Sequence, residues 1–121
     1  MHSELCLVAC SDPRLQKTHI TLLNMIGHHT YREEVVDVVI VPGGGATNAT
    51  QHRHDIADLH ALHSFPVLYL VAHTDCGKIP DAEQGLANLR ANAEWARTQL
   101  AVEVRCFMED PHTHTWKEVM V

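Results

Sequence analysis

Apolar residues occur in this chain in two kinds of segment, which alternate along its length. In the first kind they form short unbroken runs rich in valine, isoleucine and leucine, which favour strands. These runs predict four strands, at residues 4–9, 35–41, 67–72 and 102–108. In the second kind they return every three or four positions, as on one face of a helix. These segments predict three helices, at residues 15–27, 48–63 and 81–100.

The order of these segments predicts how they pack. Strands that alternate with helices form right-handed crossovers and a parallel sheet. Residues 35–41 are almost all β-branched, which favours a strand that is buried on both faces. Residues 115–120 predict a short final strand or arm. We therefore expect an α/β fold with a mostly parallel sheet of four to five strands and helices on both faces, in a single domain spanning residues 1–121.

Composition narrows the class of protein. Hydrophobic residues make up 45% of the 121 positions, as in a globular chain, and the formal net charge is -6. An acidic chain is a poor partner for nucleic acid, and no apolar run approaches the roughly 20 residues of a membrane span. The first residues lack the basic and apolar regions of a signal peptide. We therefore expect a cytoplasmic protein whose four cysteines are reduced.

Two predicted strands end in side chains that bind metals. Cys10 follows residues 4–9, and His73 follows residues 67–72, with Cys76 three positions further on. The carboxyl ends of parallel strands lie at one edge of a sheet, where binding sites gather. Thiolate and imidazole are the ligands that zinc prefers, and three of them leave a fourth position. These residues predict a zinc site in which a bound water is acidified towards a pKa of about 7.

The fourth position has a candidate occupant in Asp12, two residues after Cys10. If Asp12 binds the metal, water is displaced and the site is closed. Arg14 offers a guanidinium that can hold the carboxylate of Asp12 through two hydrogen bonds. We therefore predict that Arg14 controls whether Asp12 accepts a hydrogen bond from the bound water or binds the metal itself. We call this arrangement the gate.

Other residues that could take part in binding or catalysis have simpler interpretations. Cys6 and Cys106 lie inside predicted strands, and we expect them to be buried apolar side chains. The loop Gly43-Gly-Gly45 could hold a phosphate group, but close packing of backbone near the metal explains it better.

Several histidines flank loops or helix ends: His28, His29, His52, His54, His112 and His114. The first four could carry protons from the site, and the last two could bind a stray metal ion, although most such histidines are solvated surface residues.

The two metal motifs resemble those of a known family. Cys10-Ser-Asp12-Pro-Arg14 and His73-Thr-Asp-Cys76-Gly are similar to the two zinc signatures of the β-class carbonic anhydrases. The segment Val39-Ile-Val-Pro-Gly-Gly-Gly45 corresponds to that family's strand and glycine turn, with Val41 and Pro42 in place of its arginine and asparagine. The resemblance covers most of the chain and identifies a compact, divergent member.

The resemblance implies an activity and a set of roles. Cys10, His73 and Cys76 would bind one Zn²⁺ ion, and Asp12 and Arg14 would form the dyad beside its water. The reaction would be the reversible hydration of carbon dioxide to bicarbonate by a zinc-bound hydroxide, in a homodimer. The edge of the fourth strand and the arm around Trp116 are the expected contact surfaces.

Two alternatives remain open. Asp12 could close the site permanently, which would leave a zinc protein without catalytic activity, or the substrate could be a related small molecule such as carbonyl sulfide or carbon disulfide.

Overall fold

The structure, a computed structural model, describes residues 3–25, 36–48 and 51–120. It contains five strands: β1 (Leu5–Cys10), β2 (Val36–Val41), β3 (Val67–His73), β4 (Glu103–Asp110) and β5 (Thr115–Val119). The α-helices are α1 (Gln16–Met25), α2 (Gln51–His63) and α3 (Ala82–Leu100), with single 3₁₀ turns η1 (Pro13–Leu15) and η2 (Gly44–Ala46). The residues on which we placed the end of the first helix, Gly27, and the start of the second strand, 35, lie outside the described ranges.

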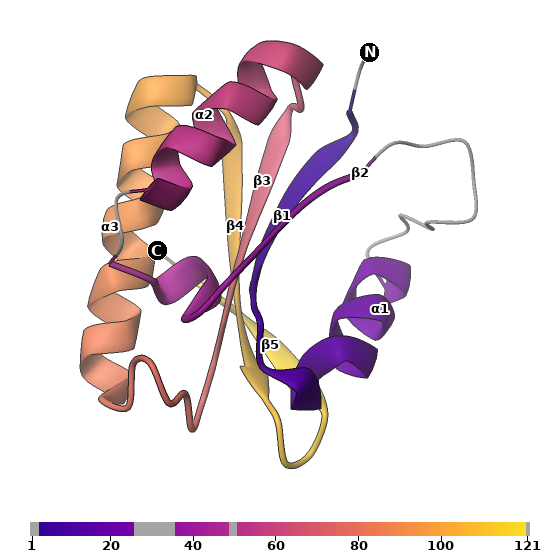
Figure 1. The fold of residues 1–121 in the computed structure, drawn as a ribbon, viewed down its shortest axis with the longest axis vertical. Helices are drawn as coiled ribbons and strands as arrows, with labels where there is room; N and C mark the ends of the chain where they lie inside the picture. The colour runs from indigo at the N-terminus through magenta and orange to yellow at the C-terminus, as the bar shows by residue number, and fades with distance from the viewer. Residues whose placement is uncertain (1–2, 26–35, 49–50, 121) are drawn as a thin grey trace.

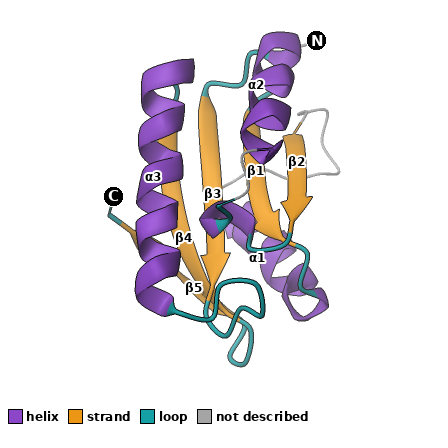
Figure 2. Cartoon of the chain, turned by 60° about the vertical axis from the view of Figure 1, so that its left-hand side comes forward, coloured by secondary structure: helices purple, strands orange, loops and turns teal. Residues whose placement is uncertain are grey.

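The strands form one sheet in the order β2-β1-β3-β4-β5. The first four are parallel to one another, and β5 pairs antiparallel with β4. Helices α2 and α3 lie on one side of this sheet and α1 on the other (Figures 1 and 2). The predicted α/β fold, with a mostly parallel sheet and helices on both faces, is confirmed.

Alternation along β1 divides the core into two layers. Leu5, Leu7 and Ala9 face α1, where they pack with Leu22 and Leu23. The side chains between them, including Cys6 and Val8, face α2 and α3. All six residues of β1 are buried, as expected for a strand at the centre of a sheet with helices on both faces.

The expectation that residues 35–41 are buried on both faces is wrong. β2 is an edge strand, and the side chains of Val38 and Ile40 are 48% and 49% exposed. Both lie in register with buried residues of β1, Leu7 and Ala9, on the face towards α1. A run of β-branched residues indicates that a strand forms, but it does not indicate the position of that strand in the sheet.

The predicted contact surface on the fourth strand also needs correction. β4 pairs with β3 along one edge and with β5 along the other, so it offers no free edge to another subunit. Within the described sheet, the unpaired edges belong to β2 and β5. None of the described helices combines the length and the apolar character that crossing a membrane would require.

Candidate metal centre

Cys10, His73 and Cys76 meet at the carboxyl edge of the sheet. Cys10 is the last residue of β1, His73 is the last residue of β3, and Cys76 lies in the turn that follows β3. One ligand atom from each residue lies within 4.8 Å of the other two, and all three residues are buried. This spacing, with two sulfur atoms and one imidazole, suits a tetrahedral zinc ion.

The orientation of the His73 ring supports this use of the cluster. Its Nδ1 lies 2.6 Å from the carbonyl oxygen of Thr74, which fixes the hydrogen on Nδ1. The other nitrogen, Nε2, is buried and has no hydrogen-bond partner. A buried nitrogen with a free lone pair is costly unless it meets a donor or a metal. The residues present therefore fit a zinc ion, with Nε2 of His73 as the imidazole ligand.

The other two cysteines differ in their surroundings. Cys6 and Cys106 face the layer of α2 and α3, and each is at most 1% exposed. Burial raises the pKa of each thiol to about 12, with a smaller contribution from Asp37 at Cys6. Both remain protonated near neutral pH, as expected for buried apolar side chains.

Asp12 and Arg14 form the dyad that the sequence suggested. The Nε atom of Arg14 donates to both carboxylate oxygens of Asp12 at 3.0 Å, Nη2 donates to Oδ2, and the backbone N–H of Arg14 donates to Oδ1 at 2.9 Å. These bonds lower the pKa of Asp12 to about 2. Oδ2 of Asp12 lies 3.9 Å from Nε2 of His73. The carboxylate is thus ionised, held by Arg14 and adjacent to the cluster.

Asp75 is a partner of Arg14 that the sequence analysis missed. Nη1 of Arg14 donates to Oδ2 of Asp75 at 3.1 Å, and Nη2 donates to its carbonyl oxygen at 3.0 Å. Asp75 adopts a φ of 53°, a left-handed conformation that aspartate tolerates better than most residues. Nε2 of His112, in the β4–β5 turn, lies 2.9 Å from the same Oδ2. Arg14 is therefore held from both sides, by Asp12 and by Asp75.

The glycine loop brings η2 against the ends of β1 and β3. A Cβ atom on Gly44 would lie 2.5 Å from the carbonyl oxygen of Val71 and 2.6 Å from the backbone nitrogen of Cys10. Gly44 also has a positive φ of 56°. A Cβ on Gly45 would lie 2.7 Å from the nitrogen of Val71. Close backbone packing beside the cluster, the simpler interpretation of this loop, agrees with the structure.

Two asparagines of α3 hold this loop in place. Nδ2 of Asn92 donates to the carbonyl oxygens of Gly45 and Thr47, both at 2.9 Å, and Nδ2 of Asn88 donates to that of Ala46. Asn92 is 3% exposed, and its Oδ1 accepts from Arg53 of α2. The sequence signal was available, since Asn92 interrupts the apolar stripe of Leu89, Ala93 and Ala96.

A buried pair, His19 and Glu109, lies behind Cys10. Nδ1 of His19, on α1, is 3.0 Å from Oε1 and 3.1 Å from Oε2 of Glu109. Its Nε2 lies 3.3 Å from the carbonyl oxygen of Cys10. Although burial acts against the charged form, the hydrogen bond and the negative charge of Glu109 raise the pKa of His19.

Two cavities meet the cluster from different sides. One is a wide basin of about 510 Å³ that includes Cys10, Asp12, Arg14 and His73 in its lining. The other is a smaller, partly open space of about 70 Å³ that His73 and Cys76 help to line. Apart from these two residues, its lining is mostly small or apolar: Gly43, Ala46, Ala72, Ile79, Pro80, Ala82, Gly85 and Met108, with Thr74 and Asp75.

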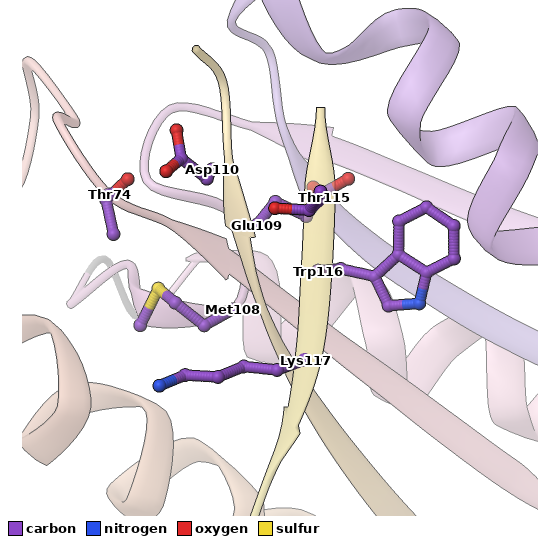
Figure 3. Close-up of a pocket in the computed structure, with 7 residues that line it drawn as sticks. All are labelled: Thr74, Met108, Glu109, Asp110, Thr115, Trp116 and Lys117. Carbon is purple, nitrogen blue, oxygen red and sulfur yellow. The ribbon is translucent and has the colours of Figure 1, made fainter. Parts of the chain in front are cut away.

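A third cavity, of about 260 Å³, lies beside the β4–β5 hairpin (Figure 3). Met108 and Lys117 extend to one side of the hairpin there, and the ring of Trp116 extends to the other. The lining does not include Cys10, His73 or Cys76. This cavity does not reach the proposed ligands, although it shares Thr74 and Met108 with the cavity of about 70 Å³.

The candidate proton carriers are distributed unevenly around the site. His28 and His29 lie outside the described ranges. His52 is 2% exposed, whereas His54 lies at the surface. His112, which the sequence suggested only as a metal ligand, contacts Asp75 and is thereby linked to the Asp12–Arg14 dyad. Neither His112 nor His114 joins a metal-binding group in the described part of the chain.

No protein-family model matches this sequence, and no curated protein does. Solved structures do resemble the fold. A carbonic anhydrase from Glaciozyma antarctica superposes with a TM-score of 0.69 over 99% of this chain and 85% of its own, at 14% identity. A tetrameric β-carbonic anhydrase from Sordaria macrospora gives 0.61 over 100% and 82%, at 15% identity. A carbon disulfide hydrolase gives 0.62 over 96% and 78%, at 12% identity.

These similarities confirm the resemblance at the level of the fold. The chain has the fold of the β-class carbonic anhydrases, and the carbon disulfide hydrolase has a similar fold. At such low identity a common fold does not establish a common activity.

Proposed function

We propose that this chain binds one Zn²⁺ ion through Cys10, His73 and Cys76 and catalyses the reversible hydration of carbon dioxide to bicarbonate. The donor set supports zinc, because two thiols and a buried imidazole nitrogen without a hydrogen-bond partner converge within 4.8 Å. Zinc bound there would supply an acidified water as the nucleophile at neutral pH.

The observation that carries the proposal is the position of Asp12. A site closed by Asp12 would have no use for an arginine that occupies both oxygens of its carboxylate. Here Arg14 does so, and the wide basin opens on the same side of the cluster. This arrangement favours an open fourth position over the non-catalytic alternative.

The residues of the chain then have distinct tasks. Asp12, ionised because its pKa is about 2, would accept a hydrogen bond from the nucleophile and orient it towards the substrate. Arg14 keeps the carboxylate in this orientation, and Asp75 keeps Arg14 in place. Cys10, His73 and Cys76, all of them buried, would hold the ion.

A second substrate class has support of its own. The cavity of about 70 Å³ that His73 and Cys76 help to line is small and mostly apolar, and a carbon disulfide hydrolase has a similar fold. Carbonyl sulfide and carbon disulfide are linear, uncharged molecules like carbon dioxide. We therefore propose them as alternative substrates of the same centre.

One sample tests these proposals. Protein of known zinc content is assayed from about pH 6 to about pH 9 with carbon dioxide, carbonyl sulfide and carbon disulfide in turn. We expect turnover of at least one substrate, rising with pH as the nucleophile forms. A fully zinc-loaded protein that turns over none of them at any pH would support the non-catalytic alternative.

A further inference from the structure

The pair of His19 and Glu109 takes no part in the chemistry proposed above, yet both side chains are buried. His19 is 8% exposed and Glu109 is 1% exposed. Burying an ionisable pair costs desolvation energy that good geometry must offset. The location of the pair indicates what it does.

The imidazole of His19 joins three elements at the carboxyl edge of the sheet. It lies on α1, its Nδ1 contacts both oxygens of Glu109 on β4, and its Nε2 contacts the carbonyl oxygen of Cys10 at the end of β1. Glu109 is itself fixed, because it pairs in register with His73 and its carbonyl oxygen accepts from Thr74 N–H at 2.9 Å. Figure 3 shows Glu109 on β4, beside Asp110.

The peptide group between Cys10 and Ser11 is therefore held at both ends. Its carbonyl oxygen faces Nε2 of His19, and its N–H donates to the carbonyl oxygen of Val41 at 3.2 Å. β1 ends at this peptide, so the regular sheet ladder no longer fixes the chain beyond it. Without His19, the backbone at Cys10 would lose its restraint on the side of α1.

We propose that His19, oriented by Glu109, is a positioning residue that fixes the backbone of Cys10 and so sets the place of its sulfur atom relative to His73 and Cys76. This inference rests on the proposed metal site. In this inference, Nε2 of His19 restrains the backbone of Cys10, and the contact of Nδ1 with Glu109 orients the ring.

Two amide variants separate these contacts. In His19→Asn the amide nitrogen can occupy the place of Nδ1, where it donates to Glu109 but does not reach Cys10. In His19→Gln the amide nitrogen can occupy the place of Nε2, where it donates to the carbonyl oxygen of Cys10 but leaves Glu109 without its partner. If the pair only stabilised the fold, the variant with the lower stability would also have the more disturbed metal site.

The first readout uses metal-free protein, so it does not depend on catalysis or on zinc. The rate of alkylation is measured by mass spectrometry at Cys10 and at Cys76, and their ratio is compared among the variants. We expect His19→Asn to raise the ratio about five- to tenfold and His19→Gln to stay within about twofold of the wild type. Unfolding in urea should give the opposite order, with His19→Gln the less stable because it buries an unpaired carboxylate.

The second readout is binding of Co²⁺ to the same proteins, followed by the thiolate-to-cobalt absorption band. We expect His19→Asn to bind about tenfold more weakly than His19→Gln. Should His19→Gln be too unstable to study, the double variant with Glu109→Gln removes the buried charge and keeps the donor to Cys10. Equal alkylation ratios in His19→Asn and the wild type would overturn the inference, whatever the hydration assay gives.

Discussion

The four cysteines of this chain occupy two different environments, although all of them are buried. Cys10 and Cys76 face each other and His73 at the edge of the sheet, whereas Cys6 and Cys106 lie beneath α2 and α3. Thiol reactivity follows the fraction of thiolate and the access of the reagent. Cys6 and Cys106 are at most 1% exposed, and burial raises the pKa of their thiols, so we expect both to react slowly.

Alkylation of metal-free protein at about pH 8 should therefore reach two cysteines. We expect Cys10 and Cys76 to be modified first, because burial raises the pKa of the Cys6 and Cys106 thiols to about 12. Added Zn²⁺ should protect the reactive pair. Peptide mapping by mass spectrometry identifies the sites, and modification of Cys106 as fast as Cys76 would contradict the prediction.

Replacing one proposed ligand should remove the metal. In Cys76→Ser the site keeps one thiolate and one imidazole, so we expect zinc affinity to fall by at least about a hundredfold. Cys106→Ser is the matched control, and its zinc content should equal that of the wild type. The measurement is zinc per chain after dialysis against a weak chelator. Stoichiometric zinc in Cys76→Ser would show that the ligand set is wrong.

Removing Arg14 should free Asp12 without emptying the site. In Arg14→Ala the carboxylate loses its donors and can reach the fourth position, so we expect hydration to fall at least about a hundredfold while zinc stays bound. Arg90→Ala, on the exposed surface of α3, is the control and should retain full activity. An active Arg14→Ala enzyme would exclude the gate.

The sequence predicts those parts of the centre that the order of the strands brings together. Cys10, His73 and Cys76 could be placed together because parallel strands end at a common edge. Asp75 and His19 could not, since their partners Arg14 and Glu109 lie 61 and 90 positions away in the sequence. Cys10 and His73 are also far apart in the sequence, but both end strands of one parallel sheet. Asp75 lies in the turn after β3 and His19 lies on α1, and the order of the strands does not specify their side-chain contacts.

At the scale of elements, the glycine loop packs so closely against the sheet that Gly44 and Gly45 cannot be replaced without a clash. Gly44 has no room for a side chain between Val71 and Cys10, and its φ is positive. The backbones of β1 and β3 would have to move apart to admit a methyl group. The loop therefore links the two strands that end in Cys10 and His73.

Gly44→Ala should destabilise the protein by about 2–4 kcal/mol and weaken zinc binding as well. Gly77→Ala is the matched control, because a Cβ there would have nothing within 4 Å. We expect the control to fold and bind zinc like the wild type, although Gly77 belongs to the zinc motif. Urea unfolding and zinc titration measure both effects, and a stable Gly44→Ala protein would refute the predicted clash.

The elements were easier to predict than their neighbours in the sheet. Periodicity and β-branched runs located the strands and helices to within a few residues, and Asp81, predicted as the start of the long helix, is its N-cap. The position of β2 at the edge was not predictable in the same way. Strand order depends on how the crossovers pack, which no single segment encodes.

At the scale of the molecule, the apolar side chains of β2 suggest where a second subunit binds. Val38 and Ile40 are about half exposed on an edge strand, and such edges favour pairing with another chain. We therefore expect a homodimer whose contact includes β2. Val38→Glu should raise the dissociation constant at least about tenfold.

Sedimentation velocity over a range of concentrations measures this shift. Ala91→Glu is the control, since it adds the same charge on the exposed surface of α3, a helix that packs against β3 and β4. A wild-type protein that sediments as a monomer at all concentrations would exclude the dimer, and a dimer unaffected by Val38→Glu would place the contact elsewhere.

The charged groups around the centre differ from the proposed ligands in their exposure to solvent, and so in their sensitivity to salt. Arg14, Asp75 and His112 lie at the surface, whereas the proposed ligands are buried. Dissolved ions screen exposed charges strongly and buried groups weakly. An increase in ionic strength should therefore weaken the interaction between Arg14 and Asp12 before it affects the metal ligands. The orientation of Asp12, rather than the binding of a metal, should be the more salt-sensitive property of the centre.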